Sequence, residues 1–226
     1  MKLVIGNKNY SSWSLRPWLL FSYFDLEFEE INIQLFNEGM REKMQGICPA
    51  YKVPALIIDD IQVWDSLAIC QFINEEHLDG KAMPAHAKLK AFSLSACAEM
   101  HSGFNGIRSE LPMNIRAEHP LLLSDLSELC QNDIQRVIEL LSQALELSAI
   151  NSSGYLLGEF GIIDCMFMPI MSRFNTYHIK LPEPLTRYQQ KMLNEPAFIK
   201  WKEVALKEKE VIELDERGYL IENNLI

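Results

Sequence analysis

The chain has 226 residues, a formal net charge of −10 and 48% hydrophobic residues. A chain of this length and composition can bury a sizeable core without metal or disulfides. An acidic chain repels phosphate backbones and no Lys/Arg cluster with interleaved aromatic residues occurs, so we expect no nucleic-acid partner. The apolar runs are several-fold too short to cross a bilayer, so we also expect no membrane partner.

The cysteines give no sign of a disulfide framework or of a dithiol redox pair, because their number is odd and none lies in a C-x-x-C motif. We expect them to be small buried apolar residues, and the chain to be cytoplasmic. The apolar run 3–5 is far shorter than the hydrophobic region of a secretory signal. The five cysteines are Cys48, Cys70, Cys97, Cys130 and Cys165.

The first 80 residues carry alternating strand and helix patterns. Short apolar or alternating runs predict strands, and apolar residues at helical spacing predict helices, in the order β-α-β-α-β-β-α. The expected strands are 2–6, 28–33, 54–58 and 61–64, and the expected helices are 15–22, 37–46 and 65–79.

After about residue 82 the pattern is helical throughout. Two amphipathic stripes, at 134–145 and 163–174, are the clearest examples. The chain is therefore predicted to be an α/β domain at 1–80 followed by an all-α domain at 86–226. For the charged segment 207–226, a docked strap and a mobile tail both remain open.

Several common site motifs are missing from the sequence. It contains no G-x-G pair, no phosphate-binding G-x-x-x-x-G-K-[ST] loop and no G-x-S-x-G elbow. The five histidines are scattered without metal-ligand spacing, so we assume no metal.

Val53-Pro54 stands at the mouth of an apolar strand. One interpretation is an ordinary strand-start proline. The other is a cis peptide that turns the N–H and C=O of Val53 outward, so that a bound peptide can pair with them as an extra strand.

Asp65-Ser66 stands at a predicted helix start. Both residue types are preferred N-caps and need no ligand in that role. The functional interpretation is that Ser66 and the positive helix end bind a ligand carboxylate while Asp65 binds a ligand ammonium. Together they would recognise an amino-acid-like group.

The segment 11–16, which reads SSWSLR, links the first strand to the first helix. Its serines could be simple caps. Alternatively, a serine hydroxyl at a helix N-terminus donates a hydrogen bond to a bound thiolate and lowers the pKa of that thiol.

The strand and helix order, the V-P, the D-S and the helical second half together resemble the cytosolic glutathione transferases over nearly the whole chain. SSWSLR is similar to the S-S-C-S-W-R signature of the zeta class, the maleylacetoacetate isomerase-like members, with Trp13 in place of cysteine and Leu15 in place of tryptophan. The family's helix signature G-x-x-[ST]-x-x-D is met by Gly158 and Asp164, but Gly161 stands at the hydroxyl position, so half of a capping box is lost.

The resemblance implies a thioredoxin-like N-terminal domain, an all-helical C-terminal domain, glutathione as cosubstrate and a homodimer. It assigns Ser11 as the catalytic hydroxyl, with Ser12 as the adjacent alternative. The implied glutathione-binding residues are Lys52, Val53, Pro54, Asp65 and Ser66.

A pocket for the electrophile is expected on the first helix of the second domain. Met100, His101, Phe104 and Arg108 recur there at i, i+1, i+4 and i+8, forming an apolar wall with one cation. The alternative is a core face with a solvated Arg108. The first interpretation predicts a small electrophile with an apolar body and an anionic group.

The leading hypothesis is thus a serine-type glutathione transferase that conjugates the thiol to a small electrophile, in detoxification, or catalyses a glutathione-dependent isomerisation. The competing hypothesis is a non-catalytic transferase-like protein-interaction module. Glutathione-dependent reduction of disulfides or peroxides is the other enzymatic alternative, although the first loop lacks cysteine.

Overall fold

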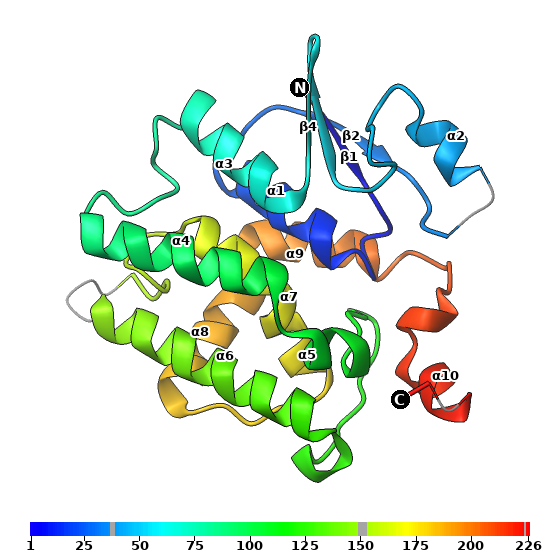
Figure 1. The fold of residues 1–226 in the computed structure, drawn as a ribbon, viewed down its shortest axis with the longest axis vertical. Coiled ribbons are helices and arrows are strands. Elements are labelled where there is room, and N and C mark those ends of the chain that lie inside the picture. The colour runs from blue at the N-terminus through cyan, green and yellow to red at the C-terminus, as the bar shows by residue number, and fades with distance from the viewer. Residues whose placement is uncertain (37–38, 149–152, 224) are drawn as a thin grey trace.

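A computed structural model describes residues 1–36, 39–148, 153–223 and 225–226. The sheet lies at one end of the molecule and most helices at the other (Figure 1). The elements of the first part are β1 (Lys2–Ile5), α1 (Ser12–Tyr23), β2 (Glu29–Asn32), α2 (Met40–Met44), β3 (Ala55–Ile58), β4 (Ile61–Trp64) and α3 (Ser66–Glu76).

The sheet has the strand order β2-β1-β3-β4. β1 pairs in parallel with β2 and antiparallel with β3, so that Val4 lies between Ile31 and Ala55. The predicted order of elements is confirmed. The expected helix at 37–46 is a shorter helix at 40–44, and residues 37 and 38 lie outside the described part of the chain.

The second part is helical, as predicted. Its described elements are α4 (Ala87–Ser102), α5 (Asn105–Glu110), η1 (Leu123–Asp125), α6 (Glu128–Leu147), α7 (Ile162–Thr176), α8 (Glu183–Leu193), α9 (Pro196–Ala205), η2 (Glu213–Asp215) and α10 (Arg217–Glu222). The fold class is therefore a thioredoxin-like N-terminal domain followed by an all-helical domain.

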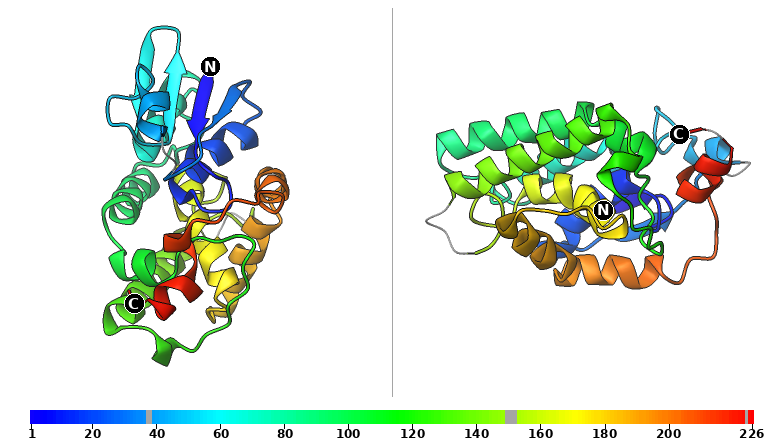
Figure 2. Two further views of the ribbon diagram at one scale, coloured as in Figure 1. Left: turned by 90° about the vertical axis from the view of Figure 1, so that its right-hand side faces the viewer. Right: turned by 90° about the horizontal axis from the view of Figure 1, so that it is seen from below.

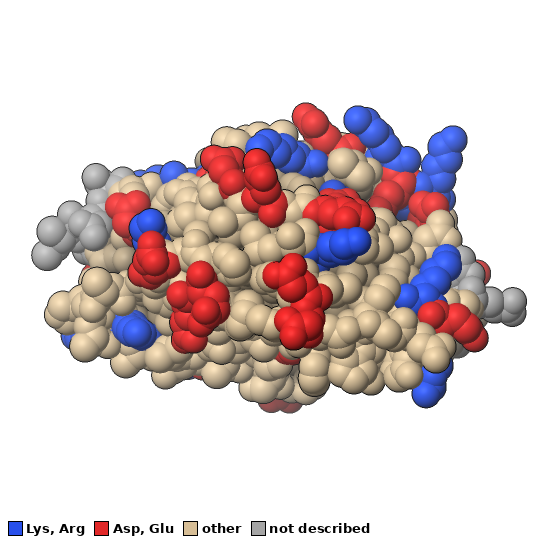
Figure 3. Space-filling model, turned by 90° about the horizontal axis from the view of Figure 1, so that it is seen from above, with Lys and Arg blue, Asp and Glu red and all other residues tan. Residues whose placement is uncertain are grey.

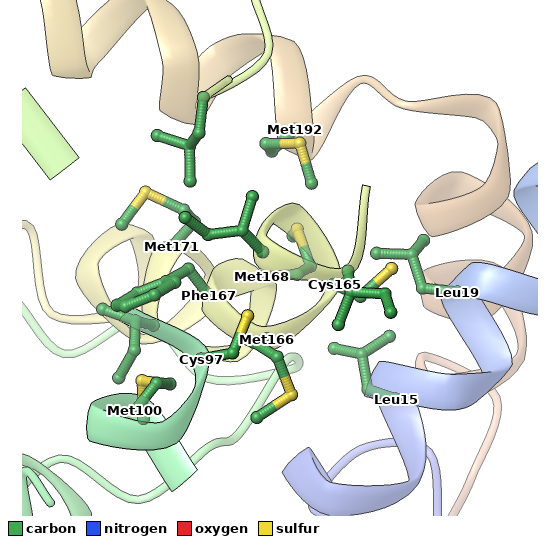
Figure 4. Packing of buried hydrophobic residues seen from close by; sticks show 14 of the residues in the cluster. Leu15, Leu19, Cys97, Met100, Cys165, Met166, Phe167, Met168, Met171 and Met192 are labelled. Atoms are coloured by element: carbon green, nitrogen blue, oxygen red, sulfur yellow. The ribbon is translucent and has the colours of Figure 1, made fainter. Parts of the chain in front are cut away.

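Helix α7 is the centre of the core. Every residue of this helix except Asn175 is buried, as expected for a helix surrounded by other elements. Its methionines, including Met166 and Met168, pack with Leu15 and Leu19 of α1 in a sulfur-rich cluster (Figure 4). Because α1 packs directly on α7, the start of α1 has a fixed position relative to the helical part.

The cysteine thiols are free and buried, in agreement with the sequence interpretation. Burial raises the pKa of Cys97 and of Cys130 to about 12, and that of Cys165 well above its ordinary value. These thiols stay protonated at neutral pH, which makes them poor nucleophiles.

The start of α7 keeps half of the capping box, as the sequence indicated. Asp164 accepts the Gly161 N–H at 2.9 Å and the Leu156 N–H at 3.1 Å, but Gly161 has no side chain with which to reciprocate. Asp164 Oδ1 also accepts the Tyr188 hydroxyl at 3.1 Å.

The C-terminal segment is a docked strap rather than a free tail. Glu208 accepts the backbone N–H groups of Lys8 and Asn9 at 2.7 and 2.9 Å. Farther along, the Tyr10 hydroxyl donates to Glu216 at 2.6 Å. The strap then continues to α10 beside the helical part (Figure 2) and fixes the loop between β1 and α1.

None of the described helices is both long and apolar enough to cross a membrane. Acidic and basic side chains are interspersed on the face shown in Figure 3.

Candidate functional site

The first predicted site element is the N-terminus of α1, which begins at Ser12 with Ser11 as its N-cap. The Ser11 hydroxyl accepts the Ser14 N–H at 3.4 Å and lies 2.8 Å from the Ser14 hydroxyl. Ser14 Oγ in turn accepts the Gly6 N–H at 3.0 Å. Ser11 therefore belongs to a local capping network, which is the structural interpretation of this residue.

Ser12 has different partners from Ser11. Its hydroxyl accepts a hydrogen bond of 3.3 Å from Nη2 of Arg173, a buried residue of α7. Arg173 also donates to the carbonyls of Leu111 and Pro169. Burial, and then Arg108 nearby, lower the pKa of Arg173 to about 10, so it remains a cation at neutral pH.

The second site element is the N-terminus of α3, where Asp65 is the N-cap and Ser66 the first residue. Asp65 Oδ1 accepts the N–H groups of Leu67 and Ala68 at 2.9 and 3.3 Å. Its other oxygen, Oδ2, lies 3.3 Å from Nε2 of His101 on α4. Capping thus occupies one oxygen of Asp65 and leaves the half-exposed second oxygen beside His101.

Arg16 joins the two helix starts. Its guanidinium is wholly buried, and Nη1 donates to Ser66 Oγ at 3.3 Å. Nε and Nη2 have no hydrogen-bond partner among the described residues. Burial, followed by the charges of Arg108 and Arg173, lowers the pKa of Arg16 to about 9. A cation therefore lies directly behind the expected carboxylate-binding serine.

Trp13 packs at the centre of these groups. The guanidinium carbons of Arg16 and Arg108 lie 4.2 and 4.6 Å from the centroid of its ring. His101 contacts the same ring edge-on, with the ring centroids 5.4 Å apart. Cation–π contacts of this kind hold the arginines in place without neutralising their charge.

The third predicted element is Val53-Pro54, whose peptide bond is cis, as the functional interpretation proposed. Val53 is half-buried and Pro54 is buried at the start of β3. Lys52 is exposed, and among the described residues no hydrogen bond or ion pair joins it to the starts of α1 and α3.

The expected arrangement of the electrophile pocket is wrong in one respect, because its four residues do not share one helix. α4 ends at Ser102, and Phe104 adopts a left-handed conformation, φ +61°, that opens the separate helix α5. Met100 and Phe104 are buried core residues, while His101 is half-buried against Trp13. The four residues keep helical spacing in the sequence, although the chain turns a corner at 103–104.

The alternative interpretation supposed that Arg108 is solvated, but its guanidinium instead donates to backbone carbonyls. Its Nε donates to the carbonyl of Gly103 at 2.9 Å, and its Nη2 donates to that of Met100 at 2.5 Å. It therefore closes the corner between α4 and α5 while contributing positive charge beside Trp13.

Sequence reasoning missed the role of Arg173 and treated Arg16 as packing. A signal for Arg173 was present, because it and Asp164 are the only charged residues in the otherwise uncharged run 162–176. A charge within a fully buried helix needs partners, and such a residue is a candidate for a specific role. Across the described ranges, no group of three or more His, Cys, Asp or Glu residues could hold a metal ion.

Known proteins resemble this chain both in sequence and in fold. A family model described as "Glutathione S-transferase, N-terminal domain" matches residues 10–76. A curated relative, the "Probable maleylacetoacetate isomerase" of Caenorhabditis elegans, is 28% identical over 192 residues, which cover 83% of this chain and 86% of the relative.

Solved structures show the same fold. A bacterial zeta-class maleyl pyruvate isomerase has a TM-score of 0.70 at 16% identity, covering 93% of this chain and all of its own. A glutathione transferase homologue from Burkholderia, solved with bound glutathione, has a TM-score of 0.68 at 15% identity, covering 92% of this chain and 98% of its own. Residues 10–76 thus match the glutathione S-transferase N-terminal domain, and the chain as a whole shares the fold of the solved glutathione transferases.

Proposed function

We propose that this protein binds glutathione and activates its thiol with a serine hydroxyl. The observation that carries the proposal is the convergence of two helix N-termini, because Arg16 of α1 donates to Ser66 at the start of α3. One helix start presents Ser11 and Ser12, and the other presents Asp65 and Ser66.

In this proposal the α3 N-terminus and Ser66 bind the α-carboxylate of the γ-glutamyl group, and Asp65 binds its ammonium. Val53 pairs through its backbone with the cysteinyl part, and Pro54 shapes that contact. Lys52 lies at the outer edge of the same segment. The thiol then points to the start of α1, where a serine hydroxyl stabilises the thiolate.

The reaction is proposed to be conjugation or isomerisation. In conjugation the thiol proton passes to solvent, the sulfur electron pair forms a C–S bond, and the electrons of the broken bond leave with the displaced group. In isomerisation the thiolate adds to a conjugated double bond, the resulting single bond rotates, and elimination restores both the double bond and the thiolate. The relative and the fold neighbour named as isomerases support the second reaction.

The acceptor is proposed to bind beside Trp13, His101 and Arg108. Nη1 of Arg108 makes no hydrogen bond within the described part of the chain, which leaves one donor for an anionic group. Met100 and Phe104 support this wall from the core.

Titration calorimetry with glutathione tests the proposal. We expect saturable binding of glutathione and of S-methylglutathione, because the γ-glutamyl contacts do not need a free thiol. A peptide lacking the γ-glutamyl group, Cys-Gly, is the matched control and should bind far more weakly. Absence of saturable glutathione binding would refute the proposal.

The non-catalytic alternative is an outcome of the same experiment. A stoichiometric protein partner, combined with no turnover on a panel of electrophiles, would favour it over the enzyme.

We also propose a cytoplasmic homodimer. The edge strand β4 exposes Ile61 and Trp64, each 45% accessible, and α4 exposes Leu94, 42% accessible. Exposed apolar side chains of this size are typical of association surfaces. Sedimentation equilibrium should give twice the chain mass, and a monomer at all concentrations would contradict this assignment.

A further inference from the structure

We infer that Ser12, held by Arg173, is the hydroxyl that donates to the glutathione thiolate, and that Arg173 is the positioning residue of this step. The inference rests on the proposed function and specifies how its site works. It reverses the order of Ser11 and Ser12 that the family resemblance implies.

The first step concerns the hydrogen on Ser12. A guanidinium nitrogen only donates hydrogen bonds, so the 3.3 Å contact from Arg173 Nη2 uses a lone pair of Ser12 Oγ. Among the described residues, the Ser12 hydroxyl hydrogen has no protein acceptor. That hydrogen is therefore available to an external anion at the α1 N-terminus.

The second step concerns Ser11. Its hydroxyl is engaged twice by Ser14, through the 3.4 Å contact with the Ser14 N–H and the 2.8 Å contact with the Ser14 hydroxyl. Donation from Ser11 to a ligand would give up its hydrogen bond to the Ser14 hydroxyl. Ser12 can donate to a ligand without giving up a hydrogen bond.

The third step concerns charge. Arg173 donates to two carbonyls and one hydroxyl, and within the described residues no carboxylate forms an ion pair with it, although Asp215 lies near enough to raise its pKa. A hydrogen-bond chain from a cation through a hydroxyl strengthens the hydroxyl as a donor. The positive end of α1, a helix of 12 residues, acts in the same direction.

The test is the thiol pKa of enzyme-bound glutathione, followed through the ultraviolet absorbance of the thiolate as pH is varied. We expect Ser12→Ala to raise this pKa by about one to two units, the effect of losing one charge-assisted hydrogen bond. Ser11→Ala should leave it unchanged within error. Glutathione affinity should change little in either variant, because the γ-glutamyl contacts remain.

The Arg173 variants separate positioning from packing. Arg173→Met should raise the thiol pKa, and Arg173→Lys should restore part of the effect because it keeps the charge. The double variant Ser12→Ala/Arg173→Met should resemble Ser12→Ala alone, since Arg173 acts through Ser12. Arg136→Met, which removes a surface arginine paired with Glu99, is the matched control and should match wild type.

The outcomes are distinct from those of the proposed function. If glutathione does not bind the wild-type protein, the proposed function fails. If it binds with a lowered thiol pKa and only Ser11→Ala raises that pKa, the assignment to Ser12 is overturned while the function stands. Additive effects in the double variant would overturn the role of Arg173. Should Arg173→Met fail to fold, the comparison of the two serine variants still decides the assignment.

Discussion

The starts of α3 and α7 use the same residue type in two different ways. At α3, Asp65 caps the helix with one oxygen and directs the other toward the domain junction, where it is half-exposed. At α7, Asp164 is wholly buried, and its two oxygens accept three hydrogen bonds from the protein. The difference shows that the surroundings of a capping carboxylate decide whether one of its oxygens stays accessible to a ligand.

The starts of α3 and α7 also differ in the charges that surround them. Burial raises the pKa of Asp164 to about 7 against the opposing effect of its hydrogen-bond donors. Near the start of α3, burial and then the charges of Arg108 and Arg173 lower the pKa of Arg16, and burial and then the charge of Arg108 lower that of Arg173. The site region thus gathers positive charge in a chain of net charge −10, although Asp65, Asp133 and Asp215 lie near enough to offset part of it.

The largest expected effect is that of Asp164→Ala on stability. The substitution leaves the N–H groups of Gly161 and Leu156 and the Tyr188 hydroxyl without their acceptor. At about 1–3 kcal/mol for each buried unsatisfied group, the free energy of unfolding should fall by at least about 3 kcal/mol. Urea unfolding measures the loss. Asp65→Ala is the matched control and should lose about 1 kcal/mol, the usual effect of removing an N-cap. Equal losses would contradict the comparison.

Asp164 also makes stability depend on pH. Its carboxyl ionises near 3.8 in the unfolded chain but only at about 7 in the folded protein, so the folded state binds more protons between these values. Stability should therefore fall as pH rises from about 4 to about 7 and level off above that range. Asp215, whose pKa burial raises to about 6, adds a slope of the same sign. The midpoint of thermal unfolding should depend less on pH in Asp164→Asn than in wild type. An unchanged pH dependence would exclude Asp164 as its source.

Asp65→Asn should affect ligand binding more than stability. Asparagine caps helices as well as aspartate but lacks the charge that is proposed to bind the ligand ammonium. Losing a charge-assisted bond of about 1.5–3 kcal/mol should raise the Kd for glutathione about 10- to 100-fold. Calorimetry measures the affinity and urea unfolding the stability. A large loss of stability with normal affinity would make Asp65 a purely structural cap.

The smallest effect is expected for His101→Gln. The His101–Asp65 pair is 3.3 Å long with side chains 33% and 40% exposed, and solvent screens such a pair strongly. The free energy of unfolding should change by no more than about 0.5 kcal/mol. The loss of glutathione affinity should be smaller than for Asp65→Asn. If His101→Gln lost more glutathione affinity than Asp65→Asn, His101 and not Asp65 would be the main contact.

The order of elements in the first 80 residues was predictable because local patterns dominate there. Apolar strands such as 55–58 and the Asp65-Ser66 helix start carry their signals in neighbouring residues. The corner at 103–104 was not predictable from periodicity, because Phe104 keeps the helical spacing of apolar residues while its backbone turns. The docked strap depends on Glu208 meeting two N–H groups about 200 residues away in the sequence.

The sequence by itself determined the candidate groups of the site: the serines at 11–12, Val53-Pro54 and Asp65-Ser66, each marked by a short motif at an element boundary. Only the tertiary structure decided which of these groups have neighbours that change their chemistry. Ser12 differs from Ser11 because Arg173, 161 residues farther along the chain, is buried against it. Side-chain hydrogen bonds and charge depend on distance in space, and no local pattern encodes that distance.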